Sequence, residues 1–148
     1  MAADDQLEWG DHARSELRRA GARSGGARDA VIEYLATQDC CLSAQELFDG
    51  LRAEGRTVGI ASVYRALDEL AQLRLVHRVE LGHGVSRFEA AHPGGEHHHH
   101  LVCGDCGKVE AFDDTTLEKA VDRVAGTYDY ALNAHEVVLH GACGDCRR

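Results

Sequence analysis

Residues 97–106 read HHHHLVCGDC, and a second CGDC follows at residues 143–146. Two residues between paired cysteines let both sulfurs reach one tetrahedral ion, and the glycine in each pair permits the tight turn that this requires. The sequence therefore predicts a closed zinc site with four thiolate ligands, Cys103, Cys106, Cys143 and Cys146. Two redox dithiols are the alternative, but neither pair lies in the strand-to-helix context of a thioredoxin-like unit.

A helix is expected between the two cysteine pairs, because residues 107–142 form a longer connection than a zinc ribbon uses. The run Thr115-Thr116-Leu117-Glu118 has the pattern of a capping box, which predicts that the helix begins there and ends at Gly126. Its apolar face is predicted to consist of Leu117, Ala120, Val121, Val124 and Ala125.

The four histidines at residues 97–100 lead directly into Leu101-Val102-Cys103. If this run is a strand, His97 and His99 lie on one face and His98 and His100 on the other. Neutral imidazole binds zinc, iron, nickel or copper, so one strand can serve two separate metal sites. A solvated polar tract is the alternative.

The first half of the chain has the pattern of short helices followed by a hairpin. The predicted elements are helices over residues 27–37, 43–55 and 60–73 and strands over 76–80 and 85–89. A capping-box pattern, Ser43-Ala44-Gln45-Glu46, opens the second of these helices. This order is that of a winged helix-turn-helix, whose last helix enters a DNA major groove. Ser62, Tyr64 and Arg65 lie near the start of that helix, where they can reach bases or phosphates. A small helical domain that binds nothing, with Tyr64 in its core, is the alternative.

Composition limits the class of protein. The chain has 148 residues, of which 44% are hydrophobic and 28% charged, with one proline, and this fits one compact domain or two small ones. No apolar run approaches the roughly 18 residues of a membrane span, and residues 1–14 lack the apolar stretch of a signal peptide. We therefore expect a cytoplasmic protein with no membrane partner, whose cysteines bind metal rather than form disulfides.

The net charge of -9 is unevenly shared. Residues 14–87 hold eleven arginines against ten acidic residues, whereas residues 88–148 hold five basic against eleven acidic residues. This excludes a dispersed nucleic-acid-binding coat, allows a local arginine face in the first half, and favours a cation site in the second. Residues 1–13 carry four acidic residues and no Lys or Arg, and are expected to form a flexible tail.

Three stretches together resemble the ferric uptake regulator family: GIASVYRALDEL at 59–70, HHHHLVCGDCGKVEAF at 97–112 and HGACGDC at 140–146. The resemblance extends from about Leu17 to Cys146. It implies an α+β fold, with an N-terminal winged helix-turn-helix DNA-binding domain over residues 1–90 and a C-terminal α/β dimerisation domain over residues 91–148. It also implies a homodimer that represses transcription when loaded with metal and binds a palindromic operator in double-stranded DNA.

The resemblance assigns roles to individual residues. The four cysteines match the family's structural Zn2+ site. The regulatory metal site would contain Cys41, Glu89, His98 and His100, with His77 and His92 as further candidates. The second metal site would contain His97, His99, Glu118 and His135. Tyr64 and Arg65 match the DNA-contacting pair. Cys41 is a departure, because iron-type members have a histidine there.

Some of these residues can also have purely structural roles. Glu118 can be a helix cap, His135 an ordinary exposed histidine, and Cys41 a buried apolar side chain. A thiolate from Cys41 favours Zn2+ over Fe2+ at the regulatory site, so we expect a zinc-responsive repressor. An iron- or peroxide-responsive regulator of the same family is the alternative.

Two further classes of protein could use the same elements. A zinc enzyme could combine histidine and cysteine ligands with a glutamate as general base. The H-x-E and P-C-x-x-C elements of zinc deaminases do not occur, so no enzymatic activity is expected. A zinc-stabilised interaction module is the third class, and metal-dependent binding to a DNA duplex distinguishes a regulator from both.

Overall fold

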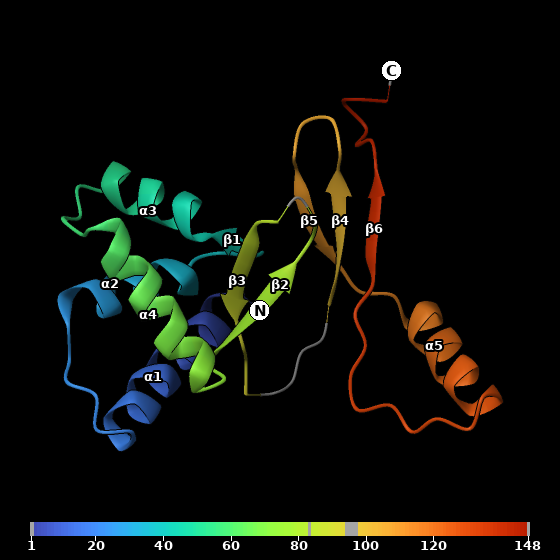
Figure 1. Ribbon diagram of the computed structural model, residues 1–148, viewed down its shortest axis with the longest axis horizontal. Helices are drawn as coiled ribbons and strands as arrows, with labels where there is room; N and C mark the ends of the chain where they lie inside the picture. The colour runs from blue at the N-terminus through green and yellow to red at the C-terminus, as the bar shows by residue number, and fades with distance from the viewer. Residues whose placement is uncertain (1, 83, 94–97, 148) are drawn as a thin grey trace. The chain divides into compact units, whose positions relative to one another are not determined.

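The computed structural model describes residues 2–82, 84–93 and 98–147, with the backbone alone for residues 2–7 (Figure 1). Contacts divide the chain into two units, residues 1–96 and 97–148. The sequence placed the domain boundary between residues 90 and 91. Within the described residues, no helix has the length and apolar character needed to cross a membrane.

The first unit is a helical domain with a small sheet. Its elements are α1 (Ala2–Arg19), α2 (Gly26–Ala36), β1 (Leu42–Ser43), α3 (Ala44–Ala53), α4 (Ile60–Gln72), β2 (Val76–Glu80) and β3 (Ser86–Ala90). The strands lie in the order β1-β3-β2, and both pairings are antiparallel. The predicted helices and the β2–β3 hairpin are confirmed, with ends shifted by one or two residues.

Local sequence and apolar packing both determine the structure of this unit. Ser43 Oγ accepts a hydrogen bond from the Glu46 N–H at 3.1 Å, and the Glu46 carboxylate accepts one from the Ser43 N–H at 2.9 Å, so the predicted capping box starts α3. Helices α3 and α4 then bury one face each against the rest of the core. The buried side chains of these two helices include Leu47, Leu51, Val63, Leu67 and Leu70.

Helix α1 corrects the expectation that residues 1–13 form a flexible tail. The helix spans Ala2–Arg19 and buries Trp9, Ala13 and Leu17 in the core of the first unit. The Trp9 indole N–H donates to the Leu75 carbonyl at 2.9 Å. The four-residue spacing of the three buried side chains is a helical stripe, which the acidic composition of this segment concealed.

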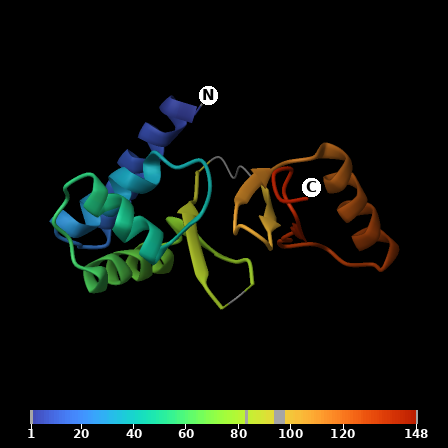
Figure 2. The same cartoon turned by 90° about the horizontal axis from the view of Figure 1, so that it is seen from above.

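The second unit combines a three-stranded sheet with one helix. Its elements are β4 (His99–Cys103), β5 (Val109–Phe112), α5 (Thr115–Thr127) and β6 (Val138–Gly141). The strand order is β5-β4-β6; β4 pairs with β5 antiparallel and with β6 parallel. Helix α5 stands to one side of the strands in both views (Figures 1 and 2). None of its thirteen residues is buried.

The cap of α5 differs from the prediction, although the helix does begin at Thr115. The capping residue is Asp114, whose carboxylate accepts a hydrogen bond from the Leu117 N–H at 2.8 Å. The predicted capping box over residues 115–118 is therefore wrong, because the residue before it already caps the helix. As a result, the Glu118 carboxylate is not the cap and is available for other contacts.

Candidate functional site

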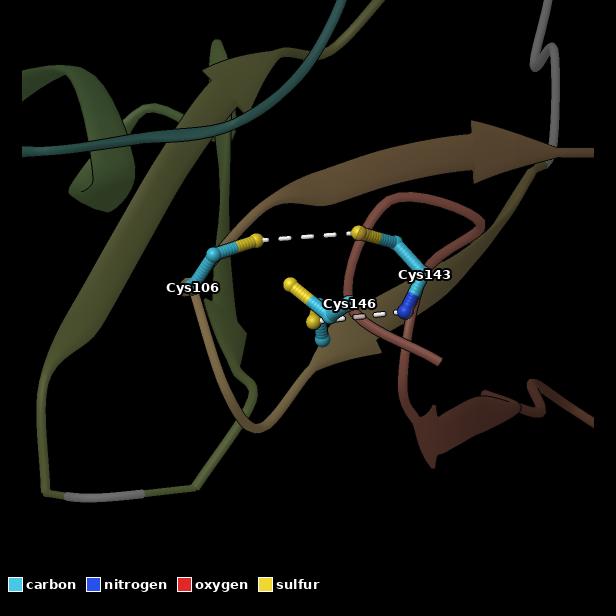
Figure 3. A group of neighbouring side chains, drawn as sticks. Cys106, Cys143 and Cys146 are labelled. Atoms are coloured by element: carbon cyan, nitrogen blue, oxygen red, sulfur yellow. Dashed lines mark hydrogen bonds between the residues drawn. The ribbon is translucent and has the colours of Figure 1, made fainter. Parts of the chain in front are cut away.

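The two C-x-x-C pairs meet at one end of the sheet in the second unit. Cys103 ends β4 and Cys106 lies in the turn that follows it, while Cys143 and Cys146 follow β6. Since β4 and β6 are parallel, their carboxyl ends lie at the same end of the sheet, and both cysteine pairs are found there. All four Sγ atoms lie within 4.8 Å of one another. Figure 3 shows the sulfurs of Cys106, Cys143 and Cys146 gathered in one place.

The spacing of these sulfurs fits a tetrahedral zinc ion. The Cys106 and Cys143 Sγ atoms are 3.8 Å apart, and zinc–sulfur bonds of roughly 2.3 Å give a tetrahedron edge of about 3.8 Å. Backbone N–H groups of Cys106 and Cys143 donate to the Cys103 sulfur and lower the pKa of Cys103 to about 6. The neighbouring sulfurs, Cys143 foremost, raise the pKa of Cys146 to about 12. A bound divalent cation would stabilise the thiolate form of all four cysteines and so offset the mutual repulsion of the neighbouring sulfurs.

A second cluster in the same unit joins β4 to α5. The Glu118 carboxylate lies 2.5 Å from His99 Nε2 and 2.8 Å from His135 Nε2, and the three ligand groups are within 4.8 Å of one another. Two imidazoles and a carboxylate suit a borderline divalent ion. Glu118 and His135 are thus brought together with His99, whereas His97 lies outside the described residues.

The ring of His99 has a defined orientation. Its Nδ1 accepts a hydrogen bond from the Val137 N–H at 3.2 Å, so the neutral ring carries its proton on Nε2, facing Glu118. An ion bound to Nε2 would take the place of that proton, and the neutral ring would then carry its single proton on Nδ1 instead. Metal binding at His99 therefore requires the contact with Val137 to break.

Two of the predicted regulatory residues are register partners in the sheet of the first unit, and a third lies just before β1. His77 is the register partner of Glu89 on β2 and β3. Cys41 lies one residue before β1, whose Leu42 pairs with Phe88, the chain neighbour of Glu89. The pKa of Cys41 is raised, chiefly by the Cys40 thiol 3.8 Å away and by burial, with a further contribution from the Glu89 carboxylate.

The remaining regulatory candidates are distributed over both units. The rings of His98 and His100 meet edge to face in the second unit, with centroids 5.1 Å apart. His92 follows β3 in the first unit and is half-buried. Within the part of the chain that the structure describes, neither His77 nor His92 belongs to a group of three or more potential ligand atoms within 4.8 Å.

Helix α4 presents the predicted DNA-contacting residues on its exposed side. Tyr64 is 50% exposed, which excludes it from the core, and Arg65 is exposed as well. The Arg65 guanidinium donates to Ser62 Oγ at 3.1 Å. Val63, Ala66, Leu67 and Leu70 take the buried side of the same helix.

Two features were missed by the sequence patterns. One is the contact between the Cys40 and Cys41 sulfurs, for which the only signal was that the residues are adjacent. The other is a cavity of about 370 Å3 at α1 and α2 with several arginines in its wall. Those arginines are Arg14, Arg18, Arg23 and Arg28. The sequence signal is the arginine-rich stretch near residue 18, and the turn between α1 and α2 brings these arginines to the wall of one cavity.

Known proteins resemble this chain along most of its length. The sequence pattern of the ferric uptake regulator family matches residues 19–140. The ferric uptake regulation protein of Bordetella parapertussis is 34% identical over 136 residues, which cover 91% of this chain and 96% of that protein.

Two solved structures share the fold. The crystal structure of the Vibrio cholerae ferric uptake regulator matches with a TM-score of 0.77 at 35% identity, covering 86% of this chain and 96% of that one. The Helicobacter pylori ferric uptake regulator, a protein with three functional metal-binding sites, matches with a TM-score of 0.83 at 26% identity, covering 97% and 94%.

Proposed function

The chain belongs to the ferric uptake regulator family of metal-responsive transcriptional regulators, and from this premise we propose that it is a zinc-responsive repressor. The observation that carries the choice of zinc is the buried Cys41 thiol before β1, on which the Glu89 carboxylate of β3 acts electrostatically. Thiolate is a soft ligand and favours Zn2+ over the harder Fe2+, whereas carboxylate and imidazole accept either ion.

A structural Zn2+ is assigned to Cys103, Cys106, Cys143 and Cys146. The need for it follows from the second unit's small core: among its described residues, the buried apolar side chains are those of Val102 and Cys103. Bonds to four thiolates would hold the turns after β4 and β6 together where apolar packing is scarce. We expect this ion to remain bound while the regulatory ion exchanges.

The regulatory Zn2+ is assigned to Cys41, Glu89, His98 and His100, with His77 as a neighbour of Glu89 in the sheet. Two of these ligands belong to the first unit and two to the second. Because ligands from both units would be needed for full affinity, metal binding would favour one arrangement of the units over others and shift the population toward it. His99, Glu118 and His135, with His97, are assigned to the second metal site.

The DNA-binding surface is assigned to Ser62, Tyr64 and Arg65 on α4. A homodimer is supported by the unburied apolar side of α5, where a cavity of about 460 Å3 includes Leu117, Val121, Val124 and Tyr128 in its wall. Exposed apolar surface of this kind marks an interface. A two-fold dimer with one recognition helix per subunit predicts a palindromic operator.

Iron is the second candidate for the regulatory metal. The Bordetella parapertussis relative is named a ferric uptake regulation protein, and the combination of Glu89 with His98 and His100 suits Fe2+ as well as Zn2+. With iron, Cys41 would be a buried thiol beside the site rather than a ligand.

Binding to a fluorescent duplex from the protein's own promoter tests the proposal. The titration is run in buffered free Zn2+ and, without oxygen, in buffered free Fe2+. Binding at sub-nanomolar zinc and not at micromolar iron supports a zinc sensor, and Cys41→Ser should then lose the response. Activation by micromolar iron, with Cys41→Ser unchanged, would establish the iron regulator. Duplex binding that depends on neither metal would contradict metal-responsive repression.

A further inference from the structure

Cys40 and Cys41 lie next to each other, outside the four-cysteine site, in the segment just before β1. Their Sγ atoms are 3.8 Å apart, the same separation as between Cys106 and Cys143. About 3.8 Å is the sulfur–sulfur distance expected when two thiolates bind one tetrahedral zinc ion. A disulfide would need sulfurs about 2.05 Å apart, so the pair has the spacing of a chelating dithiol.

The local backbone allows adjacent side chains to converge. In an extended strand, successive side chains point to opposite faces of the sheet. Residues 40 and 41 precede β1, which spans only Leu42–Ser43, so strand alternation does not apply to them. Cys41 is 3% exposed and Cys40 is half-buried, so the Cys41 side chain is shielded from solvent while that of Cys40 is partly accessible.

The charges around the pair favour a cation. The Glu89 carboxylate of β3 acts electrostatically on Cys41, and Arg87 of the same strand is the basic neighbour. The Arg87 guanidinium, whose side chain is 19% exposed, is bound to the Glu46 carboxylate at 2.8 Å, so its charge is already engaged. Two thiolates formed beside Glu89 would therefore carry a negative charge that a bound divalent ion neutralises.

We propose that Cys40 is a second thiolate ligand of the regulatory metal, so that the first unit supplies a Cys40–Cys41 dithiolate to a soft or borderline ion of the Zn2+, Cd2+ or Cu+ class. Each thiol gives its proton to solvent as its sulfur bonds to the metal, so one divalent ion binds with the release of two protons. This inference rests on the proposed function, and it deepens it, since a dithiolate discriminates more strongly against Fe2+ and Mn2+ than Cys41 alone.

Co2+ absorbance counts the thiolates directly. Full-length protein, reduced and holding one equivalent of structural zinc, is titrated with one equivalent of Co2+, and the thiolate-to-cobalt charge-transfer band is measured. The His99–Glu118–His135 cluster contains no sulfur and does not contribute to this band. Cys40→Ser and Cys41→Ser should each lower the band by about half, and the double variant should abolish it. Elemental analysis confirms that the structural zinc stays bound.

The control variant is Gln38→Ala, in the same segment, whose amide donates to the Thr37 hydroxyl; it should leave the band unchanged. Far-UV circular dichroism of each variant establishes that the first unit is folded. In chelator competition, Cys40→Ser should bind Zn2+ at least about tenfold more weakly than Gln38→Ala, and its preference for Zn2+ over Fe2+ should fall.

The outcomes separate this inference from the proposed function. A full band in folded Cys40→Ser, with none in Cys41→Ser, would show one thiolate and overturn the dithiolate while leaving zinc sensing intact. The absence of a band in the wild type would overturn the dithiolate whether or not duplex binding responds to metal. The expected halving in both variants, combined with duplex binding that ignores metal, would instead contradict the regulator and leave the dithiolate standing.

Discussion

The two units of this chain are stabilised in different ways. The first buries a continuous apolar core built from α1, α2, α3, α4 and the sheet. In the described part of the second unit the buried apolar side chains are Val102 and Cys103, and α5 buries none. The first unit can therefore be stable through packing alone, whereas the second is expected to depend on a metal ion and on a partner subunit.

Removal of the structural zinc should produce the largest difference between the two units. Chelation under reducing conditions, or Cys106→Ser, should unfold the second unit, because zinc binding in such sites supplies on the order of 10 kcal/mol of folding free energy. Hydrogen exchange should show lost protection in β4, β5 and β6 and retained protection in α2 and α4. Equal loss of protection in both units would contradict the difference drawn between them.

Truncation of one core side chain should have the next largest effect. Leu67 is fully buried in α4, whereas Leu139 on β6 is 47% exposed. Leu67→Ala should lower the free energy of unfolding of the first unit by roughly 2–5 kcal/mol, and the matched Leu139→Ala by about 0.5 kcal/mol or less. Urea unfolding of the zinc-loaded protein measures both losses. Similar losses for the two variants would contradict the proposal that apolar burial stabilises the first unit more than the second.

The apolar side of α5 can be tested by measuring self-association of the protein. Val124 is 49% exposed and belongs to the wall of the 460 Å3 cavity. A charge there would be desolvated in a dimer, so Val124→Asp should weaken self-association by about 100-fold, or roughly 2.7 kcal/mol. Sedimentation measures the dimer constant. Asp122→Lys, at an exposed position of the same helix, is the control, and an unchanged constant in Val124→Asp would remove α5 from the interface.

The smallest expected effect concerns the start of α3. Ser43→Ala removes the hydroxyl that accepts the Glu46 N–H, which should cost about 1 kcal/mol in the first unit. Thermal unfolding measures this loss. Asp114→Ala removes the equivalent cap of α5; it should act on the second unit alone, and a change in the first unit's transition would show that the units unfold together.

Local patterns in the sequence predicted most of the elements. The Ser43 capping box, the apolar spacing of α4 and the hairpin of β2 and β3 all depend on residues a few positions apart, and all three are confirmed. The convergence of the two C-x-x-C pairs was also predictable, because the chemistry of the ligands restricts them to one site.

Tertiary structure decided the features that depend on residues far apart in the chain. Trp9 makes α1 part of the core because its indole reaches Leu75, a contact that composition does not reveal. Pairing of β2 with β3 places His77 opposite Glu89, pairing of β1 with β3 places the segment before β1 next to the same strand, and Glu118 of α5 meets His99 and His135. Sequence alone therefore determined helices, turns and ligand types, since these follow from short-range geometry. Strand register and packing determined which ligands meet, since those distances exist only in the folded chain.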